Sequence, residues 1–157
     1  MKSVLISIQP KWVDKIEIGE KTIEVRKTRP KLEPPFKCYI YETKQTVKYF
    51  SLKFDGVGKV IGEFVCDRIA GEGETIRGNA CLTVEELQDY CNGKDIYFWR
   101  ISNLKIYDKP KELSEFRKYY ECGNNSCGSC DKCDKDYRLT RPPQSWCYVE
   151  ELKELKE

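Results

Sequence analysis

The chain has 157 residues, of which 39% are hydrophobic and 34% charged, and its net charge is +2. This composition suits one folded domain with a hydrophobic core and is unlike that of membrane-spanning or disordered chains. Nine cysteines and no histidine exclude Ser-His-Asp and Cys-His catalysis, a histidine zinc site and a histidine pH switch. Any acid or base must therefore be Asp, Glu, Lys, Tyr or Cys.

The first residues lack the features of a signal peptide, because the apolar run from Val4 ends at Gln9 and Pro10. No stretch approaches the roughly 20 apolar residues that a membrane span needs. We therefore expect a cytoplasmic protein with reduced thiols and no membrane partner. Among oligomeric states we favour a monomer.

The N-terminal segment predicts a strand followed by a helix. Val4–Ile8 alternates apolar and small polar residues, as strands do. Pro10 suits the first position of a helix whose apolar face would hold Trp12 and Ile16. Gly19 suits the position that follows the end of this helix.

Residues 21–26 predict a second strand with two chemically different faces. Ile23 and Val25 would face the core. Thr22, Glu24 and Arg26 would share the opposite face, because side chains alternate along a strand.

The remaining chain predicts further short strands and few helices. Residues 43–58 are polar and fit either a hairpin or a loop. Thr83–Glu86 has the form of a capping box at the start of a short helix. The spacing of Leu113, Phe116 and Tyr120 predicts another helix after Pro110. The further strands are expected at Cys38–Tyr41, Lys59–Cys66, Ile96–Ile101 (extended or followed by Leu104–Tyr107) and Trp146–Val149. Without βαβ alternation, this pattern favours an α+β fold or a small, partly closed barrel with helices at its ends.

Four of the nine cysteines form the compact motif C-x4-C-x2-C-x2-C: Cys122, Cys127, Cys130 and Cys133. Four thiolates can bind Zn²⁺ tetrahedrally at about 2.3 Å. The ion would order a segment that has no apolar residues of its own. We therefore predict a structural zinc in an insertion at about 121–136, with an iron–sulfur cluster or a metal-free loop as alternatives. The other five cysteines are expected in the core, although Cys147 could replace one metal ligand; they are Cys38, Cys66, Cys81, Cys91 and Cys147.

Positive charge gathers around the second predicted strand, at Lys21, Arg26, Lys27, Arg29 and Lys31. Basic groups interleaved with aromatic rings can hold phosphates and stack bases. The ordinary alternative is a solvated edge strand, which lysine and arginine protect from pairing with other chains.

Several segments resemble ASCH-domain proteins of the PUA-like superfamily. They are residues 6–12 (ISIQPKW), 19–26 (GEKTIEVR), 58–64 (GKVIGEF) and the ending 139–149 (LTRPPQSWCYV), which is similar to that of small bacterial and phage-type members. The resemblance covers most of the chain, treated as a single domain over 1–157, but not the cysteine-rich insertion. It implies a PUA-like small mixed β-barrel with flanking short helices, a cleft beside the first helix and the K-T-I-E-x-R strand, and RNA or nucleotide binding.

The first functional hypothesis is therefore an RNA- or nucleotide-binding module. Its ligand would lie in a basic, polar cleft lined by Lys11, Trp12, Lys21, Thr22, Glu24 and Arg26. Two structural alternatives accompany it: Glu24 pairs only with Arg26, and Trp12 belongs to the core rather than stacking on a ligand.

The alternative hypothesis is an amidohydrolase acting on an acylated nucleoside such as N4-acetylcytidine. One enzymatic branch that the chain resembles uses a lysine matching Lys21, a threonine nucleophile where this chain has Glu24, and a later glutamate. Here Lys21 would hold the oxyanion and Glu24 would act as general base, with Glu72 or Glu74 as the later carboxylate. A third hypothesis is a protein-interaction module that uses the cysteine-rich insertion as its contact surface.

Overall fold

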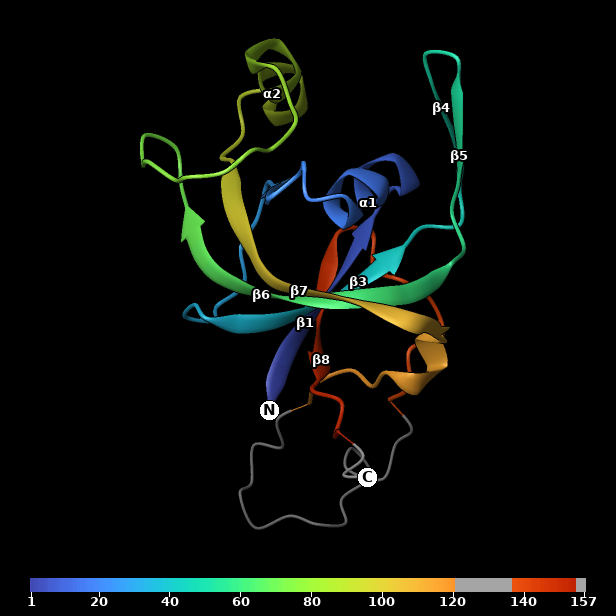
Figure 1. The fold of residues 1–157 in the computed structure, drawn as a ribbon. Coiled ribbons are helices and arrows are strands. Elements are labelled where there is room, and N and C mark those ends of the chain that lie inside the picture. The colour runs from blue at the N-terminus through green and yellow to red at the C-terminus, as the bar shows by residue number, and fades with distance from the viewer. Residues whose placement is uncertain (121–136, 155–157) are drawn as a thin grey trace.

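Six of the eight strands in the described chain form one curled mixed sheet (Figure 1). The computed structural model describes residues 1–120 and 137–154. Its elements are β1 (Lys2–Ile8), α1 (Pro10–Glu17), β2 (Ile23–Arg26), β3 (Phe36–Glu42), β4 (Thr46–Tyr49), β5 (Leu52–Asp55), β6 (Lys59–Ala70), α2 (Val84–Cys91), β7 (Tyr97–Lys111), a 3-10 turn (Leu113–Glu115) and β8 (Trp146–Glu150).

The strand order of the sheet is β2-β7-β6-β3-β1-β8. β1 and β3 are parallel, and every other neighbouring pair is antiparallel. The long strands β6 and β7 arch across the molecule and give the sheet its curl (Figure 1). β4 and β5 form a separate hairpin, so the ambiguous segment 43–58 contains a hairpin.

Side chains join the two ends of this strand order. Arg26, at the end of β2, donates from Nη2 to the carbonyl oxygen of Ser7 in β1 (2.7 Å) and from Nη1 to Oγ of Ser145 (3.2 Å). Trp146, the first residue of β8, donates from Nε1 to Oγ1 of Thr28 (2.9 Å). The sheet is therefore a partly closed barrel, which confirms the mixed β-barrel with short helices.

The central strands are buried on both faces. Ile6 and Trp99 belong to an inner apolar cluster, which α1 covers with Ile16. Leu5, the neighbour of Ile6 along β1, belongs to an outer cluster that Phe116 covers. Because side chains alternate along a strand, two covered faces require the nearly continuous apolar run seen in β1.

Both helices begin where the sequence predicts. Pro10 is in the first turn of α1, and Gly19, with φ of +81°, follows its end. Thr83 and Glu86 form the capping box of α2, in which each side chain accepts a 3.1 Å hydrogen bond from the other residue's backbone N–H. Both helices lie on the same side of the sheet as the β4–β5 hairpin (Figure 1). No helix in the described ranges is long and apolar enough to cross a membrane.

The helix predicted after Pro110 is wrong. β7 continues through Pro110 to Lys111, and only a 3-10 turn follows it. Leu113 and Phe116 are apolar because they pack on the outer cluster of the sheet. Lys118 then bridges to Val149 of β8, so the chain beyond the turn is extended.

The core prediction for the cysteines is only partly right. Cys38 and Cys66 are buried, and burial raises the pKa of the Cys66 thiol to about 12. The other three described cysteines are only partly buried, since they lie in the loop before α2, on α2 and in β8: Cys81, Cys91 and Cys147. The predicted zinc ligands lie outside the described residues: Cys122, Cys127, Cys130 and Cys133. Within the described ranges, no group of three or more Cys, Asp or Glu residues is placed to hold a metal.

Candidate functional site

A cavity of about 440 Å³ lies where β1, α1, β2 and the segment before β8 meet. This volume is in the range of small-molecule sites. It is lined by Ser7, Ile8, Gln9, Trp12, Lys21, Glu24, Val25, Arg26, Thr43, Gln45, Leu82, Tyr90, Gln144 and Ser145. We call it the β2 pocket.

The charged residues of this pocket are buried. Lys21, Glu24 and Arg26 are 3%, 6% and 9% exposed. β2 is at the end of the strand order, yet its polar face is turned into the pocket and not toward water. The solvated edge strand is therefore wrong for Lys21 and Arg26, whereas Arg29 and Lys31, beyond the end of β2, are exposed.

The two carboxylate oxygens of Glu24 differ in their hydrogen bonding. Its Oε1 accepts a 3.3 Å hydrogen bond from Nε of Arg26 and lies 3.2 Å from Nη2. Its Oε2 is buried and accepts no hydrogen bond from any residue in the described ranges. The ammonium Nζ of Lys21 lies 4.0 Å from this oxygen, which is an ion-pair distance. A buried carboxylate oxygen without a donor is costly for a fold, and such a group calls for an explanation.

Lys21 is fixed from two directions. Its Nζ donates a 2.5 Å hydrogen bond to the carbonyl oxygen of Ala80 and lies 5.0 Å from the ring centre of Trp12. Burial lowers the pKa of Lys21, and the nearby carboxylate of Glu24 opposes that shift.

The loop before α2 brings Ala80 to Lys21 by pairing with the start of β2. The carbonyl oxygen of Asn79 accepts hydrogen bonds from the backbone N–H groups of Thr22 (2.8 Å) and Ile23 (3.1 Å). The backbone N–H of Asn79 donates to Oγ1 of Thr22 at 2.9 Å. Gly78 makes this approach possible, because a Cβ there would lie 2.8 Å from the side chains of Ile23 and Thr22.

Further lining residues come from α2, the loop before it and the segment before β8. Tyr90 of α2, Leu82, Gln144 and Ser145 line the pocket. Burial raises the pKa of Tyr90 above its ordinary value. Lys27 lies 4.7 Å from the ring centre of Tyr90. The predictions from sequence missed these four residues. The similarity of the ending 139–149 to ASCH-type chains was a signal for Gln144 and Ser145, and the sequence offered none for Leu82 and Tyr90.

The structure brings together four of the six residues predicted to bind ligand. Trp12, Lys21, Glu24 and Arg26 line the β2 pocket. Thr22 does not, because its hydroxyl accepts from the backbone of Asn79. Lys11 does not line the pocket either; its Nζ lies 4.7 Å from the ring centre of Trp12. The two candidates for the later carboxylate of a hydrolase, Glu72 and Glu74, are also absent from the lining of the pocket.

Solved structures share this architecture. A mutant ASCH protein from Zymomonas mobilis aligns over 94% of this chain and 88% of its own, with a TM-score of 0.60 and 19% identity. The chain has the ASCH-domain fold. A second mutant of that protein aligns over 72% of this chain and 77% of its own (TM-score 0.56, 22% identity). A further structure of ASCH from Zymomonas mobilis aligns over 71% of this chain and 73% of its own (TM-score 0.53, 21% identity).

These alignments confirm the ASCH fold that the sequence resemblance implies. No protein-family model and no curated protein matches the chain. A function must therefore be inferred from the β2 pocket itself.

The arrangement of the pocket suits recognition of a small polar group. The open oxygen of Glu24 can accept a hydrogen bond from an N–H or O–H of a ligand. Trp12 and Tyr90 offer aromatic surface, and Gln45 and Gln144 offer amides that both donate and accept. Buried charges held in fixed positions lose little entropy when such a ligand binds.

Proposed function

We propose that this chain is an RNA-binding module that holds one base in the β2 pocket. The observation that carries the proposal is that the buried Oε2 of Glu24 accepts no hydrogen bond in the described ranges, with only the Nζ of Lys21 at ion-pair distance (4.0 Å). It favours a ligand that brings a hydrogen-bond donor, because a phosphate or carboxylate alone would place more negative charge beside it.

The exocyclic amine of a nucleobase is a donor of this kind. A carboxylate accepts well from N4 of cytosine, and adenine and guanine also carry amines. Stacking of a base on an aromatic ring is tolerant of sequence. Trp12 and Tyr90 line the pocket and support this mode of binding.

Positive charge beside the pocket supports a nucleotide rather than a free base. Lys11 and Lys27 lie over the rings of Trp12 and Tyr90, at 4.7 Å from each ring centre. Lysines so placed can contact the phosphates that flank a bound base.

The test is binding of labelled single-stranded oligocytidylate RNA at two salt concentrations. We expect saturable binding that weakens as salt rises, since phosphate contacts release counterions. Glu24→Gln should weaken binding about tenfold, because the charged acceptor is lost. Glu20→Gln is the matched control, because Glu20 is exposed and pairs only with Lys15 at 3.5 Å. Absent binding, or equal effects of the two variants, would contradict the proposal.

The alternative function, hydrolysis of an acylated nucleoside by Lys21 and Glu24, is not favoured. Lys21 donates to the carbonyl oxygen of Ala80, and one oxygen of Glu24 is occupied by Arg26. The hydrolase would also need a second glutamate, but neither candidate, Glu72 or Glu74, lines the pocket. Ligand binding, unlike hydrolysis, does not require Lys21 or Glu24 to leave these partners.

We further propose that Cys122, Cys127, Cys130 and Cys133 bind a structural zinc. The support is the spacing of four thiols within twelve residues, in a segment without apolar residues that could order it. The ion would contribute to the folding of that segment and not to the chemistry of the β2 pocket.

A further inference from the structure

A second, larger cavity lies on the outer face of the sheet, away from the β2 pocket. Its floor includes Lys37, Tyr39 and Glu63, which alternate along β3 and β6 with inner-face residues such as Cys38 and Phe64. Its volume is about 1040 Å³, more than twice that of the β2 pocket. Small-molecule sites reach about 1,000 Å³ at most, so this size suits a segment of a larger ligand.

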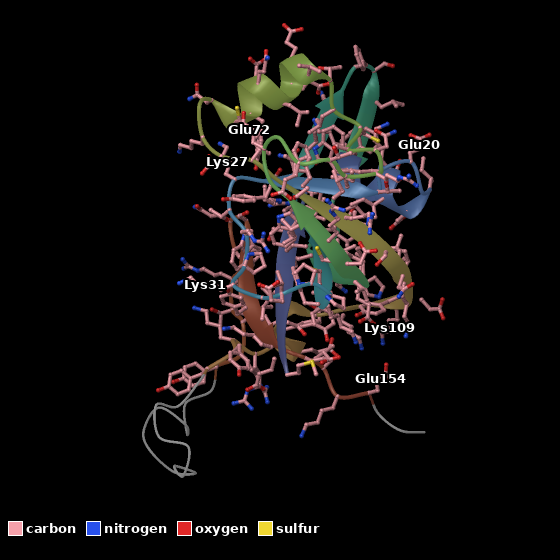
Figure 2. All side chains as sticks on the ribbon, turned by 90° about the vertical axis from the view of Figure 1, so that its left-hand side faces the viewer. Glu20, Lys27, Lys31, Glu72, Lys109 and Glu154 are labelled. Carbon is pink, nitrogen blue, oxygen red and sulfur yellow. The ribbon has the colours of Figure 1, made fainter. Side chains whose placement is uncertain are left out.

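This outer groove is rich in positive charge. Seven lysines and arginines line it, against four acidic residues, although the whole chain has a net charge of only +2. The basic residues are Lys37, Lys105, Lys109, Lys111, Arg117, Arg138 and Lys153, and the acidic ones are Glu63, Asp108, Glu115 and Glu154. Figure 2 shows Lys109 and Glu154 low on the side of the molecule opposite to Lys31.

The groove has both paired and unpaired cations. Lys37 is neutralised by Glu63 and Glu151, each at 3.1 Å, so it contributes little net charge. By contrast, the described ranges contain no ion pair for the other lysines of the groove floor, all of which come from β7: Lys105, Lys109 and Lys111. Lys105 and Lys109 are exposed, and the Nζ of Lys111 lies 5.4 Å from the ring centre of Tyr107.

The acidic and aromatic residues of the outer groove indicate which class of anionic ligand fits it. Asp108 and Glu115 would repel a ligand that carries only negative charge, such as an acidic peptide. A single strand of RNA brings phosphates for the lysines together with donors, the 2′-hydroxyl and base amines, for the carboxylates. Ile106 and Tyr107 add apolar and aromatic surface between the lysines, as in grooves that track a nucleic-acid backbone.

We propose that the outer groove is a second RNA-binding surface, on which Lys105, Lys109 and Lys111 contact phosphates of a single strand. This surface is distinct from the β2 pocket, because the outer groove lies on the other face of the sheet and the two cavities share no lining residue. The proposal does not require that a base enters that pocket.

The test is binding of labelled single-stranded oligouridylate to the full chain over a range of salt concentrations. Uracil has no exocyclic amine for Glu24, so this probe reports on phosphate binding. The variant K105Q/K109Q/K111Q should bind at least tenfold more weakly in low salt. Its slope of log K against log salt should be shallower by about 2, at about 0.7 for each phosphate that the three lysines neutralise in the wild type. The matched control K48Q/K53Q/K94Q removes three exposed lysines that line neither cavity and should bind as the wild type does.

Three outcomes would overturn the proposal. The first is an equal loss of binding in the groove variant and the control, and the second is an unchanged salt slope. The third is competition by polyglutamate as strong as that by unlabelled oligouridylate, which would assign the groove to acidic peptides. The variant K105R/K109R/K111R keeps the charge and should retain wild-type binding, which separates an effect on phosphate binding from an effect on folding. Failure of the β2-pocket proposal is seen separately, with amine-bearing bases and Glu24→Gln.

Discussion

Arg26 and Glu24 form an ion pair inside the protein, with Nη2 of the guanidinium 3.2 Å from Oε1 of the carboxylate. Their side chains are only 11% and 8% exposed. Arg26 also donates to the backbone of Ser7 and to the hydroxyl of Ser145, so the same residue closes the barrel and orients the carboxylate of the β2 pocket. Stability and ligand recognition are therefore coupled at this pair.

Replacing Arg26 with methionine should lower the free energy of unfolding by about 3–5 kcal/mol, because it leaves the buried charge of Glu24 uncompensated. Urea unfolding followed by tryptophan fluorescence would measure the change. Arg100→Met is the matched control, since the pair of Arg100 with Asp67 is just as short at 2.8 Å but is 32% and 36% exposed. A control as destabilised as the Arg26 variant would contradict this role of the buried pair.

Replacing Gly78 with alanine should loosen the loop that pairs with the start of β2. Its Cβ would meet the side chains of Ile23 and Thr22 at 2.8 Å, so the loop must shift, at a cost of about 1–3 kcal/mol. Amide hydrogen exchange should be faster at the N–H groups of Thr22 and Ile23, which donate to Asn79. Gly73→Ala is the control, because that glycine also has positive φ but open space around it. Equal acceleration of exchange in both variants would contradict a role for Gly78 in the pairing of this loop with β2.

The stability of the protein should depend on the ionisation of Lys21 in alkaline solution. Burial lowers the pKa of Lys21 from 10.5 in the folded state, so the unfolded chain binds more protons between the two values. The free energy of unfolding therefore rises with pH in that window. We expect the difference in free energy of unfolding between the wild type and Lys21→Met to become more favourable to the wild type as pH rises toward 10.5. If this difference in free energy of unfolding stays constant or falls as pH rises, the lowered pKa of Lys21 in the folded state is contradicted.

The purified protein should contain about one zinc ion per chain, held by Cys122, Cys127, Cys130 and Cys133. Elemental analysis measures this directly, and less than half an equivalent would count against the site. Cys122→Ser should reduce the zinc content, whereas Cys91→Ser, which changes a thiol on α2, should not. Binding of nucleotides in the β2 pocket should be independent of a chelator, since the proposed ion has no part in that pocket.

Much of the fold follows from local sequence signals. The proline at position 10 and the capping box of Thr83 and Glu86 each predict a helix start that the structure has. The helix expected after Pro110 fails because the spacing of Leu113 and Phe116 serves packing on the outer cluster and not a helical face. Periodicity reports which residues are buried, and tertiary contacts decide what covers them.

The candidate site was predictable only on the side formed by α1 and β2. The alternation of Glu24 and Arg26 with apolar neighbours places the two charges on one face, and the structure turns that face into a pocket. Tyr90 and Ser145 come from segments far along the chain, and their approach depends on the curl of the sheet, which no local pattern encodes. The outer groove was missed for a different reason: Lys105, Lys109 and Lys111 lie at even spacing along β7, but the strand was expected to end at Tyr107.

The most direct test of the central claim is calorimetric binding of cytidine monophosphate and uridine monophosphate to the wild-type protein. These ligands differ at position 4 of the base, where cytosine has an amine donor and uracil a carbonyl acceptor. If the open oxygen of Glu24 reads that amine, the cytidine nucleotide should bind at least tenfold more tightly, about 1.4 kcal/mol. Glu24→Gln should reduce this preference, while Glu20→Gln should keep it. Equal affinity of the wild type for the two nucleotides, or a preference that survives unchanged in Glu24→Gln, would contradict the account.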